Sequence, residues 1–201
     1  TPDVVDFEER KAKHHVALEG VIRSKHLIEA EGIDVEIVSC GFSATWNITP
    51  EFSAEITDVQ VGSYVLMDWP YQQMEGMEDF QCALTVLTTV MSKNQAKGDR
   101  KNVIITDCGI KSIATEHTAD YSINAFPKVK DLPGAEVIAH SEEHGLIQVS
   151  EEDFQRIQVG DTLELIPPHC CGTCNLHDQF YAVRGDRVDA VWPIEARGAA
   201  T

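Results

Sequence analysis

The sequence predicts an α/β segment on its amino-terminal side and an all-β domain after it. Over residues 3–31, apolar side chains recur at helical spacing among charged ones, and a β-branched run, Val35 to Ser39, follows directly. From about residue 76 onward, short apolar runs alternate with turn residues, which is typical of an antiparallel barrel or sandwich. We therefore expect a first part over residues 1–75 and a second over residues 76–201.

One long amphipathic helix opens the first part, with Asp3 as its predicted N-cap and Gly32 as its stop. The strand after it runs into a turn of mostly small residues, Cys40 to Thr45, and a second β-branched run covers residues 56–66. Such units are too few to close a parallel barrel, which needs eight strand-helix pairs and about 250 residues. We therefore expect a further barrel segment to precede this chain.

Seven apolar runs predict the strands of the second part. They cover residues 83–90, 103–106, 137–140, 146–149, 162–166, 180–183 and 188–192. Four turns are predicted at residues 97–99, 132–134, 159–161 and 184–186. Each contains glycine, which tolerates positive φ, and three also contain an aspartate that can bond to its own backbone.

The charge balance restricts the partners of this protein. Lys and Arg total 16 against 33 Asp and Glu, so the formal net charge is −17. Nucleic acid phosphates and anionic membranes would repel such a surface. No run approaches the roughly 20 apolar residues that span a bilayer, and the six cysteines form no regular disulfide framework. These features predict a soluble, cytoplasmic protein without nucleic acid or membrane partners.

Residues 167–178 hold the densest cluster of chemically reactive side chains. On an extended segment, side chains two positions apart point the same way, so His169 and Cys171 can ligate one metal ion while Cys170 faces the opposite side. Two protein ligands leave coordination positions open for a substrate oxygen or a water. Open positions are what a catalytic zinc requires.

Three other interpretations of this segment stay open. Adding Cys174 and His177 to His169 and Cys171 would give a closed structural zinc site. A thioredoxin-like dithiol is less favoured, because that motif opens a helix in a βαβ unit and this segment lies among predicted hairpins. The side chains could also simply pack in a turn.

Five segments occur in a characteristic order: residues 62–64, 106–112, 141–145, 167–178 and 192–198. In this order they resemble the D-serine dehydratase and D-threonine aldolase family. The resemblance implies the carboxyl-terminal part of an alanine-racemase-like (β/α) barrel, followed by an antiparallel β domain. It also implies pyridoxal phosphate, a divalent metal near that cofactor, a β-hydroxy D-amino acid substrate and a homodimer.

By position, the metal ligands that the resemblance implies are His169 and Cys171. A thiolate ligand favours zinc over manganese or magnesium. This preference favours the dehydratase branch of the family but does not decide which hydroxy amino acid is the substrate. In such an enzyme the metal would bind the β-hydroxyl of the substrate, either to help hydroxide leave or to promote cleavage of the Cα–Cβ bond.

The family's Gly-rich phosphate turn matches residues 40–45, which implies that Gly41, Ser43 and Thr45 bind the cofactor phosphate. Phe42 and Cys40 replace two of the family's glycines in this turn. An ordinary strand-to-helix turn is the competing interpretation. Tyr64 matches a position beside the cofactor, although a tyrosine in such a place is often only a core aromatic.

The family's Schiff-base lysine lies upstream of the region that this chain matches, so no lysine here is assigned that role. Lys111 is expected to form a structural ion pair with Asp107. Two hypotheses follow from the missing lysine. The chain is part of a lyase completed by an amino-terminal fragment, or it is a non-catalytic metal-binding or interaction module derived from such an enzyme.

Overall fold

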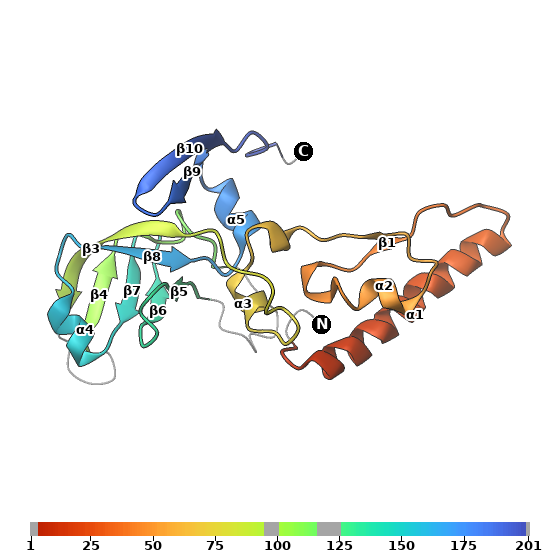
Figure 1. The fold of residues 1–201 in the computed structure, drawn as a ribbon, viewed down its shortest axis with the longest axis horizontal. Helices are drawn as coiled ribbons and strands as arrows, with labels where there is room; N and C mark the ends of the chain where they lie inside the picture. The colour runs from red at the N-terminus through yellow and green to blue at the C-terminus, as the bar shows by residue number, and fades with distance from the viewer. Residues whose placement is uncertain (1–3, 95–100, 116–125, 200–201) are drawn as a thin grey trace. The chain divides into compact units, whose positions relative to one another are not determined.

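The computed structural model describes residues 4–94, 101–115 and 126–199 (Figure 1). The chain forms two compact units that divide between Ala83 and Leu84. Unit 1 contains the long helix and several short elements, and unit 2 contains the large antiparallel sheet. Within the described residues, no helix is both long enough and apolar enough to cross a membrane.

Unit 1 begins with the predicted long helix, α1 (Phe7–Ala30). Its N-cap is Asp6, whose side chain accepts a hydrogen bond from the Glu9 amide at 2.7 Å. The predicted N-cap, Asp3, lies outside the described residues. The predicted stop is confirmed, because Gly32 follows the helix with a φ of +79° and donates to the Glu29 carbonyl.

The buried face of α1 differs from the expected apolar stripe. Arg10, His14 and Leu18 are the buried residues of this helix, whereas Val16 and Leu27 are 70% and 64% exposed. The spacing of the three buried residues is helical, but two of them are polar. Burial in unit 1 therefore depends on hydrogen bonds to polar side chains as well as on apolar contact.

The remaining elements of unit 1 are short. They are β1 (Ser39–Cys40), η1 (Ser43–Thr45), α2 (Thr49–Phe52), β2 (Asp58–Val59), η2 (Ser63–Val65) and α3 (Trp69–Gln72). The parallel pair of β1 and β2 is much shorter than the two predicted strand runs. A small apolar core forms beside them from buried Ala44, Met67, Met74 and Met77.

Unit 2 is built on a six-stranded antiparallel sheet with the order β5-β8-β3-β4-β7-β6. Its strands are β3 (Val86–Asn94), β4 (Val103–Thr106), β5 (Lys128–Val129), β6 (Glu136–His140), β7 (Gly145–Gln148) and β8 (Thr162–Ile166). The two end strands, β5 and β6, also contact each other, so the sheet is nearly closed into a barrel. Its fully buried core includes Val90, Ile104, Ile147 and Leu165.

The strand predictions in unit 2 are largely confirmed. Strands β4 and β8 match predicted runs residue for residue, and β3 begins three residues later than expected and continues to Asn94. The last two runs form a hairpin, β9 (Gln179–Arg184) and β10 (Arg187–Pro193), around Gly185 with a φ of +58°. The predicted turn at residues 97–99 lies outside the described residues.

Three elements of unit 2 were not predicted, namely β5, α4 (Glu151–Arg156) and α5 (Cys170–Asn175). A sequence signal existed for α4, because Ser150 is followed by three acidic residues. The Ser150 hydroxyl accepts from the Asp153 amide at 3.0 Å, which is an N-cap. The segment of α5 carries no comparable local signal.

Candidate functional site

The predicted metal-binding segment is partly helical. His169 is extended and precedes α5, so Cys171 lies in the first turn of a helix, and the expectation of a fully extended segment is wrong. Both the amide and the hydroxyl of Thr173 donate to the His169 carbonyl, at 3.2 and 2.8 Å, and these bonds close the first turn. Cys170 is buried and Cys171 is exposed, so these two thiols do face different ways.

Residues 112–114 hold this helix in place. The Thr173 hydroxyl accepts from the Ala114 amide at 3.1 Å, and His177 Nε2 lies 2.6 Å from the Ser112 carbonyl oxygen. Because a carbonyl can only accept, His177 carries its proton on Nε2 in this contact. The bond ties the segment that contains His169 and Cys171 to the loop at Ser112.

The carboxyl-terminal motif closes the other end of α5. The Arg197 guanidinium forms an ion pair with Asp178 at 2.6 Å and donates to the Asn175 carbonyl at 3.1 Å. The Gly198 amide donates to the Asn175 side chain at 3.2 Å. Sequence reasoning missed Arg197 as an organising residue, since no local pattern marks which acceptors a single arginine will reach.

Lys111 forms ion pairs with different partners from the one predicted. Its ammonium lies 3.0 Å from Glu143 and 3.2 Å from Glu142, and these partners raise its pKa. Asp107 instead accepts hydrogen bonds from Thr88 and Thr89. The Lys111–Asp107 expectation is therefore wrong, because the loop after β4 packs against residues 141–143.

The four donors of the closed zinc site that the sequence allows are not gathered around one point in the structure. No three of its four donors, His169, Cys171, Cys174 and His177, have ligand atoms within 4.8 Å of one another. The C-x-x-C does open a helix, contrary to expectation, but β8 and β9 on either side of α5 belong to different sheets. The βαβ setting of a thioredoxin-like dithiol is thus absent from this segment.

In unit 1, the turn at residues 40–45 requires glycine at position 41. Gly41 has a φ of +80°, and a Cβ added there would lie 2.5 Å from the Thr49 hydroxyl oxygen. The Ser43 hydroxyl accepts from the amides of Gly62 and Tyr64, both at 3.2 Å. The structure therefore brings together the four residues predicted to contact the cofactor, with Thr45 closing the turn.

The Thr45 hydroxyl forms hydrogen bonds within this turn. It accepts from the Phe42 amide and can donate to the Phe42 carbonyl, each at 3.2 Å, and the residue is fully buried. Among the described residues, the amides of Ser43 and Ala44 donate to no protein acceptor. These two amides fit an anion such as phosphate better than the Thr45 hydroxyl does.

Phe42, which departs from the family pattern, and Tyr64, which matches it, lie in different environments. The Phe42 ring packs against Tyr71 and His14, with centroid separations of 6.2 and 6.1 Å, so it joins the core of unit 1. Tyr64 is 45% exposed, and its ring lies edge-on to Phe80 with a centroid separation of 6.4 Å. The structure therefore does not show Tyr64 as a core aromatic.

Cys171, the exposed cysteine of residues 167–178, is expected to react faster with thiol reagents than the buried cysteines Cys108 and Cys170. Burial raises the pKa of Cys108 to about 12, and Cys108 and Cys170 are each 2% exposed. Because the thiolate is the nucleophile, Ellman's reagent should label Cys171 at least about tenfold faster than Cys108 in chelator-treated native protein. Cys171→Ser should remove one thiol equivalent from the fast phase, to which the half-buried Cys40, Cys82 and Cys174 can also contribute. Equal labelling rates before unfolding would contradict the burial of Cys108.

Comparison with known proteins identifies relatives over most of the chain. Residues 83–183 match the family model described as "Putative serine dehydratase domain". The chain is 32% identical over 199 residues to a 3-hydroxy-D-aspartate aldolase of Paracoccus denitrificans, covering 96% of this chain and 47% of the relative. It is 34% identical over 177 residues to a D-threonine aldolase of Arthrobacter sp., covering 86% and 42%. The chain thus spans about half the length of these relatives.

Solved structures show the same fold. A D-threonine aldolase from Filomicrobium marinum superposes with a TM-score of 0.81 at 26% identity, covering 98% of this chain and 50% of that one. An alanine-racemase-like protein from Idiomarina loihiensis gives 0.63 at 26% identity, covering 84% and 46%. The predicted fold class is confirmed. The chain belongs to the serine dehydratase-like family with the alanine-racemase-type fold, in which D-threonine aldolase and 3-hydroxy-D-aspartate aldolase are found.

Proposed function

We propose that this chain is the carboxyl-terminal part of a lyase that uses pyridoxal phosphate and a divalent metal to act on β-hydroxy D-amino acids. Family membership supports the proposal, as do relatives named for aldol cleavage of 3-hydroxy-D-aspartate and D-threonine. A D-threo-3-hydroxyaspartate dehydratase of Delftia sp. is 25% identical over 185 residues. Aldol cleavage and dehydration both act on substrates that carry an amine and a β-hydroxyl group.

The observation that carries the proposal is the His-x-Cys pair that precedes and enters α5. His169 is half-buried and Cys171 is exposed. Two other family segments hold the region around α5 in place, one through the His177–Ser112 hydrogen bond and the other through the Arg197–Asp178 ion pair. An imidazole and a thiolate suit zinc, with manganese or magnesium as the alternatives. A metal held there would act as a Lewis acid toward the β-hydroxyl of the substrate.

The turn in unit 1 would bind the cofactor phosphate. The amides of Ser43 and Ala44 would donate to phosphate oxygens. The Ser43 hydroxyl could donate as well, because it is the acceptor in its hydrogen bonds with the Gly62 and Tyr64 amides. Gly41 lets the backbone take the required conformation, and Thr45 stabilises it. Exposed Tyr64 would lie beside the cofactor. Pyridoxal phosphate supplies an electron sink for the carbanion when it is bound.

The Schiff-base lysine is proposed to come from an amino-terminal segment that this chain does not include. Lys111, the lysine within a family segment, is already paired with Glu142 and Glu143. The relatives are about twice as long as this chain, which supports such a segment. The complete protein is proposed to be a cytoplasmic homodimer.

Metal content tests the proposed site. We expect His169→Ala and Cys171→Ser each to remove about one equivalent of zinc per chain, measured by elemental analysis on protein without a histidine tag. Cys174→Ser, in the same helix, is the matched control and should keep its metal. Zinc that is unchanged by the first two substitutions would contradict the assignment. Zinc that is lost only when Cys174 and His177 are also replaced would support a structural site instead.

A further inference from the structure

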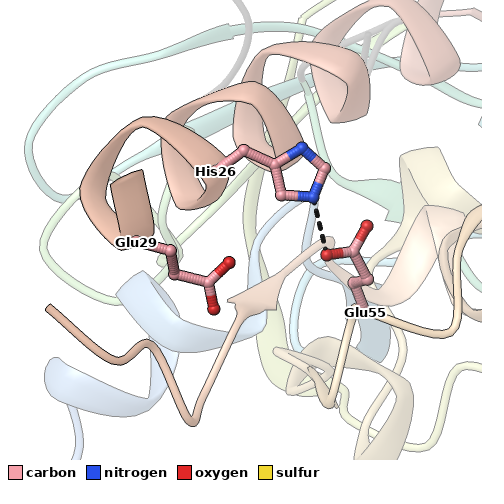
Figure 2. Close-up of side chains that lie close together, drawn as sticks. All are labelled: His26, Glu29 and Glu55. Atoms are coloured by element: carbon pink, nitrogen blue, oxygen red, sulfur yellow. Dashed lines mark hydrogen bonds and ion pairs between the residues drawn. The ribbon is translucent and has the colours of Figure 1, made fainter. Parts of the chain in front are cut away.

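A second cluster of metal-binding side chains lies in unit 1. His26 and Glu29 stand on α1, and Glu55 follows α2 (Figure 2). One ligand atom from each lies within 4.8 Å of the other two, and this is the only such group of three among the described residues. We propose that these three residues form a Zn²⁺-binding site that clamps α1 to the loop after α2.

The backbone brings these donors together from two elements. His26 and Glu29 are three residues apart on a helix, so their side chains share one face. In helical bundles a Glu-x-x-His pair on one helix holds a metal, and His26 and Glu29 have the same spacing in the reverse order. Glu55, in the loop after α2, completes the group, and its carboxylate lies 2.8 Å from His26 Nε2. The Glu55 amide donates to Ser53 Oγ at 3.2 Å, which helps to fix this loop. One imidazole and two carboxylates are a donor set that zinc accepts.

A lysine ammonium is the competitor for this site. Lys25 Nζ lies 2.6 Å from Glu29 and 3.3 Å from Glu55, and its side chain is 15% exposed. A single ammonium offsets only one of the two carboxylate charges. A divalent cation would neutralise both and would add coordination by His26, at the cost of displacing Lys25. The competition predicts that removing the ammonium strengthens metal binding.

A groove lies beside this cluster and shares one residue with it, His26. This imidazole lines the groove, which is shallow and has a volume of about 400 Å³. The other lining residues are Glu19, Ile22, Arg23, Phe52 and Ser53. Neither Glu29 nor Glu55 lines this groove, so water from the open surface around the cluster would complete the coordination of a metal that has three protein ligands.

The experiment is a titration with Zn²⁺ alone in the His169→Ala/Cys171→Ser background, so that the site in unit 2 contributes no binding. Isothermal titration calorimetry should find about one equivalent of zinc, and thermal unfolding should show stabilisation that a chelator reverses. Adding His26→Ala or Glu55→Gln should weaken binding at least about tenfold. Lys25→Met should strengthen it several-fold.

The matched control is His144→Ala. His144 is also exposed and follows two glutamates, but it belongs to no three-donor group in the described part of the chain. The proposal is overturned if no zinc binds in the double-variant background, if His26→Ala and Glu55→Gln leave binding unchanged, or if His144→Ala weakens it equally. Should a variant unfold, zinc-induced shifts of the His26 imidazole NMR signals in the double-variant background decide: shifts support the site and their absence overturns it.

Discussion

Arg10→Met is expected to lower the free energy of unfolding of unit 1 by about 3–5 kcal/mol. The side chain is fully buried, and its guanidinium donates to the carbonyls of Val4, Val5, Ala44 and Glu75. Methionine fills similar space but leaves these four acceptors without their donor. Denaturation followed by the fluorescence of Trp46 and Trp69, the tryptophans of unit 1, measures the loss.

The control for this substitution is Arg23→Met on the same helix. Arg23 is exposed, so its replacement should change the stability by no more than about 0.5 kcal/mol. Nearby carboxylates also interact electrostatically with the Arg10 guanidinium. Burial lowers its pKa, while the charge of Glu75 opposes that effect. Similar losses in both variants would show that general packing along α1, rather than the hydrogen bonds of Arg10, stabilises unit 1.

Gly109→Ala is expected to destabilise unit 2 by about 3 kcal/mol. A Cβ at this position would lie 2.5 Å from the backbone of Ser141 and Glu142. That backbone cannot move away easily, because it accepts hydrogen bonds from the amides of Ile110 and Lys111, both at 3.0 Å. Chemical denaturation followed by the fluorescence of Trp192, which lies in unit 2, measures the effect.

Gly134→Ala is the matched control, because a Cβ at Gly134 would meet no atom within 4 Å. It should leave the stability of unit 2 within about 0.5 kcal/mol of the parent. Gly109→Ala should also weaken the zinc binding proposed for His169 and Cys171, since residues 112–114 support α5. An alanine tolerated at position 109 without loss of stability would mean that the two loops are not in close contact.

The sequence by itself determined the parts of this protein that depend on local physics. Strands β4 and β8 are apolar runs bounded by turn residues, and Gly32 and Gly185 supply the positive φ at the end of α1 and in the last hairpin. The ordered motifs also predicted the family and fold class, which the relatives confirm. The cap of α4 at Ser150 was equally local and could have been found.

Only the tertiary structure decided which distant groups meet. Helix α5 contains residues with little helix preference, and it forms because Thr173 bonds to His169 and to Ala114 from another segment. The partners of Lys111 were likewise fixed by the packing of two loops. Buried polar groups pair with the partners that the fold places within hydrogen-bonding distance. These pairings therefore cannot be read from the sequence without the three-dimensional structure. The same is true of Glu55, which reaches His26 across 29 residues of chain.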